Sequence, residues 1–318
     1  MKKQLPLLFI IIAIQLAISG CGNHKTKQQV DFPEVIPGKI VFSTSRSQHG
    51  YSTALYENGS IRIVREDGGL IPQLSPNGKK MLINAPGGID IYDLNTNIIT
   101  KILQPELKVD TSYEKWFESN EKILVISRNA LGVREKIPYD LYQYDLIEKK
   151  WTKLTNYKPD EGILSFDVFK DGKRILCSYS SDYKIKGRGN RGTYIMALET
   201  GTMRKITNWA GSYEIMPDQK SFLAETAIRK GGKVVAYSDL LLVNMETGSE
   251  KRLTFDGLPK STPTVSADGQ WALYSVSGGG MERIFMLHIP TGATKEMFDR
   301  PIAYAGKIAH DRNPDWVS

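Results

Sequence analysis

The chain has 318 residues, of which 41% are hydrophobic and 24% charged, and its formal net charge at pH 7 is +7. This composition supports a folded core and excludes a largely disordered chain. One long uncharged apolar run occurs, at residues 5–18, which excludes a protein built of several membrane-spanning helices.

The N-terminus has the parts of a secretory signal. Two lysines precede the apolar run, and the small residues Ser19 and Gly20 separate the run from Cys21. The motif Ile-Ser-Gly-Cys resembles the lipobox of bacterial lipoproteins, in which the cysteine is lipidated and becomes the first residue after cleavage. We therefore expect a signal peptide over residues 1–20, cleavage between Gly20 and Cys21, and a palmitate-type lipid on Cys21. The run is shorter than the ~20 residues of a spanning helix, which disfavours an uncleaved anchor.

The segment after the lipobox predicts a flexible tether over residues 21–37, because it is mostly polar and has no sustained apolar period. His24 lies here and has no predicted role. Two or three acyl chains, each buried methylene contributing ~0.8 kcal/mol, would anchor the protein stably. We expect it in the cell envelope. Gly22 is not the aspartate of an inner-membrane retention signal, so we expect the outer membrane, facing the periplasm, in a cell that has one.

Residues 38–318 repeat one unit: an apolar strand, a tight turn, a second apolar strand, a variable loop, and two strands joined by another tight turn. The first turn recurs at steps of 43, 51, 47 and 50 residues, from Asn77 through Asn120, Asp171, Asp218 and Asp268. These steps match the ~40–50-residue period of propeller blades. The second turn recurs in phase, so each unit holds two hairpins and four strands. No segment has a sustained helical period, which argues against a parallel α/β sheet.

The repeats give six units if the two chain ends share one of them. Residues 38–69 supply three strands but no innermost strand, whereas the tail Asn313-Pro-Asp-Trp-Val-Ser318 resembles the start of other units. We therefore predict an all-β fold, a six-bladed β-propeller of four-stranded antiparallel blades. The C-terminal strand should pair into the first blade and close the ring, with Trp316 buried at the closure.

Three segments carry a resemblance to a known family. The runs that begin Ser75-Pro-Asn-Gly, Lys170-Asp-Gly and Ser266-Ala-Asp-Gly are similar to the repeat of TolB-type (WD-repeat-like) six-bladed propellers, and Val243-Asn-Met-Glu-Thr-Gly248 resembles its other half. The resemblance covers residues 38–318. The resemblance implies a TolB-like protein of the envelope, soluble or tethered, that binds another protein through a propeller face, and it is specific for fold rather than for activity.

The sequence predicts no catalytic residue, no bound metal and no cofactor, and therefore no enzyme. Cys177 lies in an apolar strand pattern without a nearby histidine, which favours a buried free thiol over a nucleophile. His288 also lies in an apolar strand pattern, where a hydrogen-bonded histidine is expected.

A candidate site lies at the predicted mouth of the channel, where the loop after one strand and the loop before an inner strand emerge on the same face. Two interpretations stand: a ligand or metal site using His49, His310 and Asp311, or ordinary polar loops. The first would make the protein a carbohydrate-binding protein or an enzyme similar to oligogalacturonate lyases, propellers that use histidines and a metal; the full histidine cluster is missing here. The candidate residues are Arg46, His49, His310, Asp311 and Arg312.

Three long basic loops join the second and third strands of consecutive units, so their charges should gather on one face. They would attract an acidic protein or an anionic glycan of the envelope, or they are lysine-rich because they are solvated. Nucleic acid is not expected, because no aromatic platform accompanies the basic residues. We predict a monomeric propeller that binds an unidentified envelope protein. The candidate binding face comprises Arg128, Arg134, Lys136, Lys184, Lys186, Arg188, Arg191, Arg229, Lys230 and Lys233.

Overall fold

The computed structural model describes most of the chain after the predicted lipobox. The described residues are 30–47, 50–66, 70–85, 88–103, 109–117, 120–129, 138–159, 161–181, 191–230, 233–278, 281–298 and 311–317. The predictions for Gly20 and Cys21 therefore lie outside the described residues. The chain divides into residues 1–31 and a compact unit of residues 32–318. In the described ranges no helix is long and apolar enough to cross a membrane.

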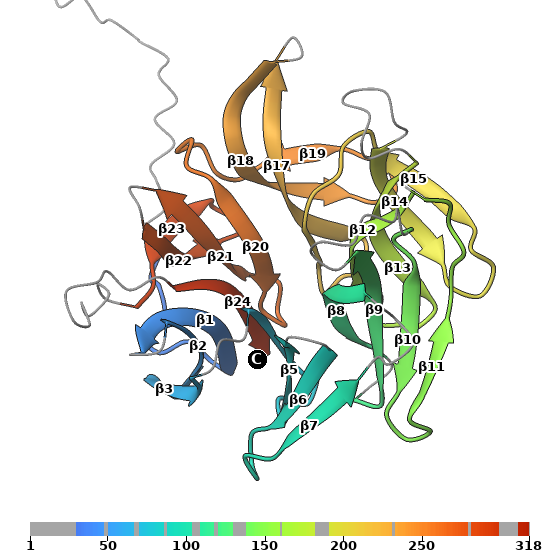
Figure 1. The fold of residues 1–318 in the computed structure, drawn as a ribbon. Coiled ribbons are helices and arrows are strands. Elements are labelled where there is room, and N and C mark those ends of the chain that lie inside the picture. Colours follow the sequence, from blue (N-terminus) through green and yellow to red (C-terminus); the bar gives the residue numbers. More distant parts are fainter. Residues whose placement is uncertain are drawn as a thin grey trace, which may run out of the picture. The chain divides into compact units, whose positions relative to one another are not determined.

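Residues 32–318 form six four-stranded antiparallel sheets, the blades, around a channel (Figure 1). From the channel outward, blade 1 contains β24 (Asp311–Val317), β1 (Lys39–Ser47), β2 (Gly50–Glu57) and β3 (Ser60–Arg65). Blade 2 contains β4 (Leu70–Leu74), β5 (Lys80–Ala85), β6 (Gly88–Asp93) and β7 (Ile99–Leu103). Blade 3 contains β8 (Val109–Phe117), β9 (Lys122–Asn129), β10 (Leu141–Asp145) and β11 (Lys150–Lys153).

The other three blades follow the same order. Blade 4 contains β12 (Gly162–Val168), β13 (Arg174–Ser180), β14 (Arg191–Ala197) and β15 (Met203–Thr207). Blade 5 contains β16 (Tyr213–Ile215), β17 (Ser221–Lys230), β18 (Lys233–Asn244) and β19 (Glu250–Arg252). Blade 6 contains β20 (Lys260–Val265), β21 (Trp271–Gly278), β22 (Met281–His288) and β23 (Ala293–Glu296). The predicted six-bladed, all-β fold is confirmed.

The second strand of each blade is a continuous apolar run, because both of its faces pack against a neighbouring blade. In β13, Ile175 and Cys177 pack into the cluster between blades 3 and 4, whereas Leu176 packs into the cluster between blades 4 and 5. Successive side chains of a strand point to opposite faces, so both faces of such a strand need apolar residues. Six clusters of this kind hold the six blades together.

The Asp-Gly signal marks the first turns of blades 4 and 6, and Asn-Gly marks that of blade 2. The Asp171 carboxylate accepts hydrogen bonds from the backbone amides of Lys173 and Arg174 at 2.9 and 3.2 Å, and Gly172 adopts a positive φ of 62°. First turns, and the outer turns between third and outermost strands, lie on one face of the ring because successive strands alternate in direction. The strand ends that flank the long loops, between second and third strands, lie on the opposite face.

The ring closes as the sequence predicts. β24 pairs with β1, with Trp316 opposite Ile40. The Trp316 side chain is 6% exposed, and its Nε1 donates a hydrogen bond to the Pro37 carbonyl at 2.8 Å. Packing in this blade interface extends upstream of the first strand, since Phe32 and Ile36 belong to the same cluster. The packed unit thus begins at Phe32.

Candidate functional site

The channel holds a belt of polar side chains, one from each inner strand. In blades 2, 4, 5 and 6 the first turn contains a backbone hydrogen bond, accepted by the carbonyl of the residue just before the turn. The belt residue lies two positions before the residue that carries this carbonyl. In β24 the equivalent position follows Pro314, as it follows Pro72 in β4. We call these six residues the channel belt: Gln73, Lys115, Asp167, Glu214, Thr264 and Asp315.

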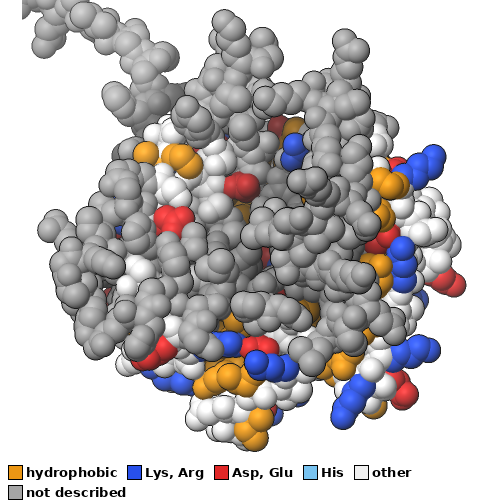
Figure 2. Space-filling model, in the orientation of Figure 1, with side chains coloured by type: hydrophobic (Ala, Val, Ile, Leu, Met, Phe, Trp, Pro, Cys, Tyr) orange, Lys and Arg blue, Asp and Glu red, His pale blue; other side chains and the backbone are white. Residues whose placement is uncertain are grey.

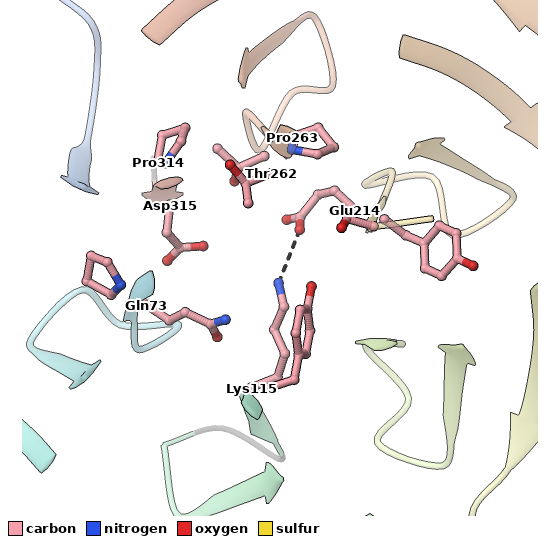
Figure 3. A pocket seen from close by; sticks show the side chains of 12 residues that line it. Gln73, Lys115, Glu214, Thr262, Pro263, Pro314 and Asp315 are labelled. Carbon is pink, nitrogen blue, oxygen red and sulfur yellow. Dashed lines mark hydrogen bonds and ion pairs between the residues drawn. The ribbon is translucent and has the colours of Figure 1, made fainter. Parts of the chain in front are cut away.

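Lys115 is the one cation of the channel belt. Its ammonium lies 3.3 Å from Glu214 Oε2 and 3.4 Å from Asp167 Oδ1. In Figure 3 its side chain points across the space toward Glu214, while Gln73 and Asp315 enter from other strands. Burial acts to lower the pKa of Lys115, but the carboxylates of Asp167 and Glu214 outweigh it and hold the pKa well above its usual value. Lys115 therefore stays charged.

Glu214 and Asp315 are held less firmly in their charged form than Lys115. Burial raises the pKa of Glu214 to about 8, although Lys115 opposes the shift, and burial also raises the pKa of Asp315. Lys115 and Glu214 therefore depend on each other for their charged forms.

Two belt carboxylates also join neighbouring blades. Asp315 Oδ2 accepts a hydrogen bond from the backbone amide of Leu74 at 2.6 Å. Asp167 Oδ2 accepts the corresponding bond from Ile215, also at 2.6 Å. These contacts give the two aspartates a structural role beside any role in binding. Within the described residues, Thr264 Oγ1 is buried against the cavity and makes no hydrogen bond.

The cavity between the inner strands is small. Its volume is about 50 Å³, enough for a few water molecules or a small ion. Pockets that enclose organic ligands usually measure about 300–1,000 Å³. Across the described ranges, no group of three His, Cys, Asp or Glu side chains has the arrangement of a metal site.

A larger cavity of about 450 Å³ lies between blades 3 and 4. Phe117, Leu154 and Leu198 give it an apolar wall, and Lys173 and Glu199 lie at its exposed rim. Its lining contains neither histidine nor cysteine. Such a groove suits an apolar side chain of a partner better than it suits chemistry.

The residues predicted at the channel mouth belong to β1, β24 and the segments beside them. The backbone register pairs Ser43 with Arg312 and Thr44 with Asp311, so the end of β1 and the start of β24 are adjacent. Arg46 lies two residues beyond this pair in β1. His49 and His310 lie outside the described residues, so a site at the mouth stays a prediction.

The predicted basic face is described only at its edges. Arg128 lies in β9, Arg191 begins β14 and is exposed, and Arg229, Lys230 and Lys233 lie at the adjoining ends of β17 and β18. These positions flank the long loops, on the face opposite the turns. The remaining members, Arg134, Lys136, Lys184, Lys186 and Arg188, lie outside the described residues, and binding at this face stays a prediction.

Cys177 and His288, the two residues considered as catalytic candidates outside the channel, have the surroundings of structural residues. Cys177 is fully buried and unpaired, as predicted, and burial raises the pKa of its thiol to about 12, which suppresses the nucleophilic thiolate. His288 ends β22, where its Nδ1 lies 2.8 Å from Thr291 Oγ1 in the following turn.

Sequence reasoning missed the channel belt. Lys115 and Glu214 are far apart in the sequence and meet only because the ring places their strands around one channel. The signal was present in the repeats, since a polar residue recurs at the same offset from the first turn.

Comparison with known proteins finds likeness in structure only. No family model matches the chain, and no curated protein matches it. TolB from Acinetobacter baumannii superposes with a TM-score of 0.67 at 18% identity, covering 88% of this chain and 66% of that one. The chain thus spans slightly less than two thirds of that protein's length.

Two further structures have the same architecture. The putative TolB from Agrobacterium tumefaciens has a TM-score of 0.59 at 14% identity, over 82% of this chain and 89% of that one. An oligogalacturonate lyase in complex with manganese has a TM-score of 0.56 at 15% identity, over 85% and 77%. At these identities the comparisons establish the fold, a TolB-like six-bladed β-propeller, and leave activity open.

Proposed function

We propose that this chain is a lipid-anchored protein of the cell envelope whose propeller is a non-catalytic module for binding another protein. The observation that carries the proposal is the channel, where the cavity of about 50 Å³ is lined by a lysine paired with carboxyl groups. A substrate-sized pocket with convergent catalytic groups is the usual sign of an enzyme. The TolB-like fold and the predicted lipobox at Cys21 support the binding and anchoring parts of the proposal.

The partner should bind the long-loop face. Basic residues cluster in three consecutive long loops, and charges on one face add into a field that steers an acidic partner. Exposed charges act over about 8–10 Å at moderate ionic strength, so this attraction should weaken as salt rises.

We expect a lipid-free chain of residues 22–318 to capture an acidic protein from an envelope extract. Alanine at Arg134, Lys136, Lys184, Lys186, Arg188 and Arg191 should abolish capture, because it removes the charge of two long loops. A control with alanine at Lys79, Lys170 and Lys220, exposed lysines of the opposite face, should bind as the parent does. Equal capture by both variants would contradict a basic docking face.

A carbohydrate-binding or lyase-like function is the second candidate. It is favoured by the backbone register that brings the end of β1 beside the start of β24, and by the likeness to a manganese-bound oligogalacturonate lyase. Under the first proposal, we expect manganese or zinc to leave the melting temperature unchanged and oligogalacturonate to remain uncleaved. A metal-dependent rise in melting temperature that His49→Ala and His310→Ala remove would favour the second candidate instead.

A further inference from the structure

The outer turns of blades 2 and 3 expose isoleucine side chains. Ile98 and Ile99, at the β6–β7 turn, are 61% and 42% exposed, and Ile147, in the β10–β11 turn, is 66% exposed. Outer turns of successive blades lie on the same face of the ring. Single exposed apolar residues are ordinary on protein surfaces, but three on adjoining turns need a reason.

The turn itself does not require these side chains. The same turn, in which an Asp or Asn side chain accepts two backbone hydrogen bonds, recurs in blades 2, 3 and 5. At the position of Ile147, blade 4 has Glu199 and blade 5 has Glu246, and at the position of Ile98 these blades have Thr202 and Ser249. The apolar side chains therefore belong to one side of the ring and not to the turn type.

Exposed lysines flank the isoleucines, together with the exposed acidic residue Glu148 in the β10–β11 turn. Lys101 lies in β7, and Lys149 and Lys150 lie in the β10–β11 turn and the start of β11; all three are exposed. Within the described part of the chain, no carboxylate pairs with the ammonium group of any of the three. In Figure 2, hydrophobic and basic side chains, with acidic ones among them, lie along the lower edge, where Figure 1 shows β6, β7, β10 and β11.

We propose that this edge, the outer turns of blades 2 and 3, binds an anionic lipid surface. Aliphatic tips that enter the headgroup region, flanked by lysines that bind lipid phosphates, are the features of interfacial membrane contact. A protein partner fits less well, because these two turns contain no aromatic or arginine side chain of the kind that anchors protein interfaces. The contact does not depend on acylation of Cys21 or on the proposed protein partner.

Lipid contact at this edge leaves the long loops accessible. The outer turns and the strand ends that flank the long loops lie on opposite faces of the ring. A propeller bound to lipid through its outer turns therefore presents its basic face to the aqueous side. The inference thus adds an orientation to the proposed function.

The test is sedimentation with vesicles. The chain beginning at Gly22 lacks the signal run, and all six blade interfaces form within residues 32–318. We expect it to bind vesicles of phosphatidylglycerol and phosphatidylethanolamine, to bind phosphatidylcholine vesicles poorly, and to dissociate as salt rises. The double variants Ile98→Ser/Ile147→Ser and Lys149→Glu/Lys150→Glu should each weaken binding about tenfold without lowering the melting temperature.

Matched controls come from the equivalent turn of blade 5. Glu246→Ser alters the position that corresponds to Ile147, and Lys251→Glu reverses an exposed lysine of β19; both should bind anionic vesicles as the parent does. The inference is overturned if the parent ignores anionic vesicles, or if the double variants bind as tightly as the parent. Protein capture by the long-loop face is measured separately, so each proposal can fail alone.

Discussion

Truncation of Trp316 to alanine should lower the free energy of unfolding by about 3–5 kcal/mol, the usual cost of emptying a large buried aromatic site. Trp316 fills the interface between blades 6 and 1 and donates to the Pro37 carbonyl. Its strand also ties the two chain ends into one blade. The loss should appear as a lower midpoint in urea, with an unchanged slope for the point variant.

Two further variants separate packing from closure. Trp316→Phe keeps most of the apolar volume and loses the hydrogen bond, so it should cost about 1 kcal/mol. Deletion of residues 311–318 removes the whole strand and should exceed the cost of Trp316→Ala, because the edge of β1 is then unpaired. If Trp316→Ala unfolds within ~1 kcal/mol of the parent, the C-terminal strand does not close the ring in solution.

The blade count and closure could be predicted because their signals are local. The Asp171 turn depends on residues within three positions of the aspartate, and the alternation of Ile175, Leu176 and Cys177 is visible in any short window. First-turn signals recur in five of the blades, and the sixth blade follows once the two chain ends are joined into one unit. Trp316 was identifiable because its proline-led context resembles the start of the other units.

The channel belt could not be found in the same way. Its members come from six strands, and whether they meet depends on the diameter of the ring and on which side chains point inward. Likewise, the polar average of residues 22–37 gives no sign that Phe32 and Ile36 pack between blades 6 and 1. The exposed state of Ile98 and Ile147 is also unreadable in sequence, because an apolar residue in a turn can equally fold back onto the core.

Lys115→Met should be strongly destabilising at pH 8. The substitution keeps the length and apolar stem but removes the ammonium beside Asp167 and Glu214. Removing one partner of a buried ion pair leaves an uncompensated charge and costs about 3–5 kcal/mol. Urea unfolding of the parent and the variant gives the difference directly.

The pH dependence distinguishes charge from packing. Glu214 has a pKa of about 8 in the folded protein, above its unfolded value of 4.5. Its protonated form therefore stabilises the fold fully below pH 4.5, and this stability is lost as the pH rises through the folded-state pKa of about 8. Without Lys115, burial should raise the carboxyl pKa values further. The loss of unfolding free energy in Lys115→Met should therefore be larger at pH 8 than at pH 5. Glu214→Gln should reduce the fall in stability that the parent shows as the pH rises.

Lys79→Met, an exposed control, should change stability by less than ~0.5 kcal/mol at both pH values. An equal loss for Lys115→Met at pH 5 and pH 8 would mean that Lys115 only fills space.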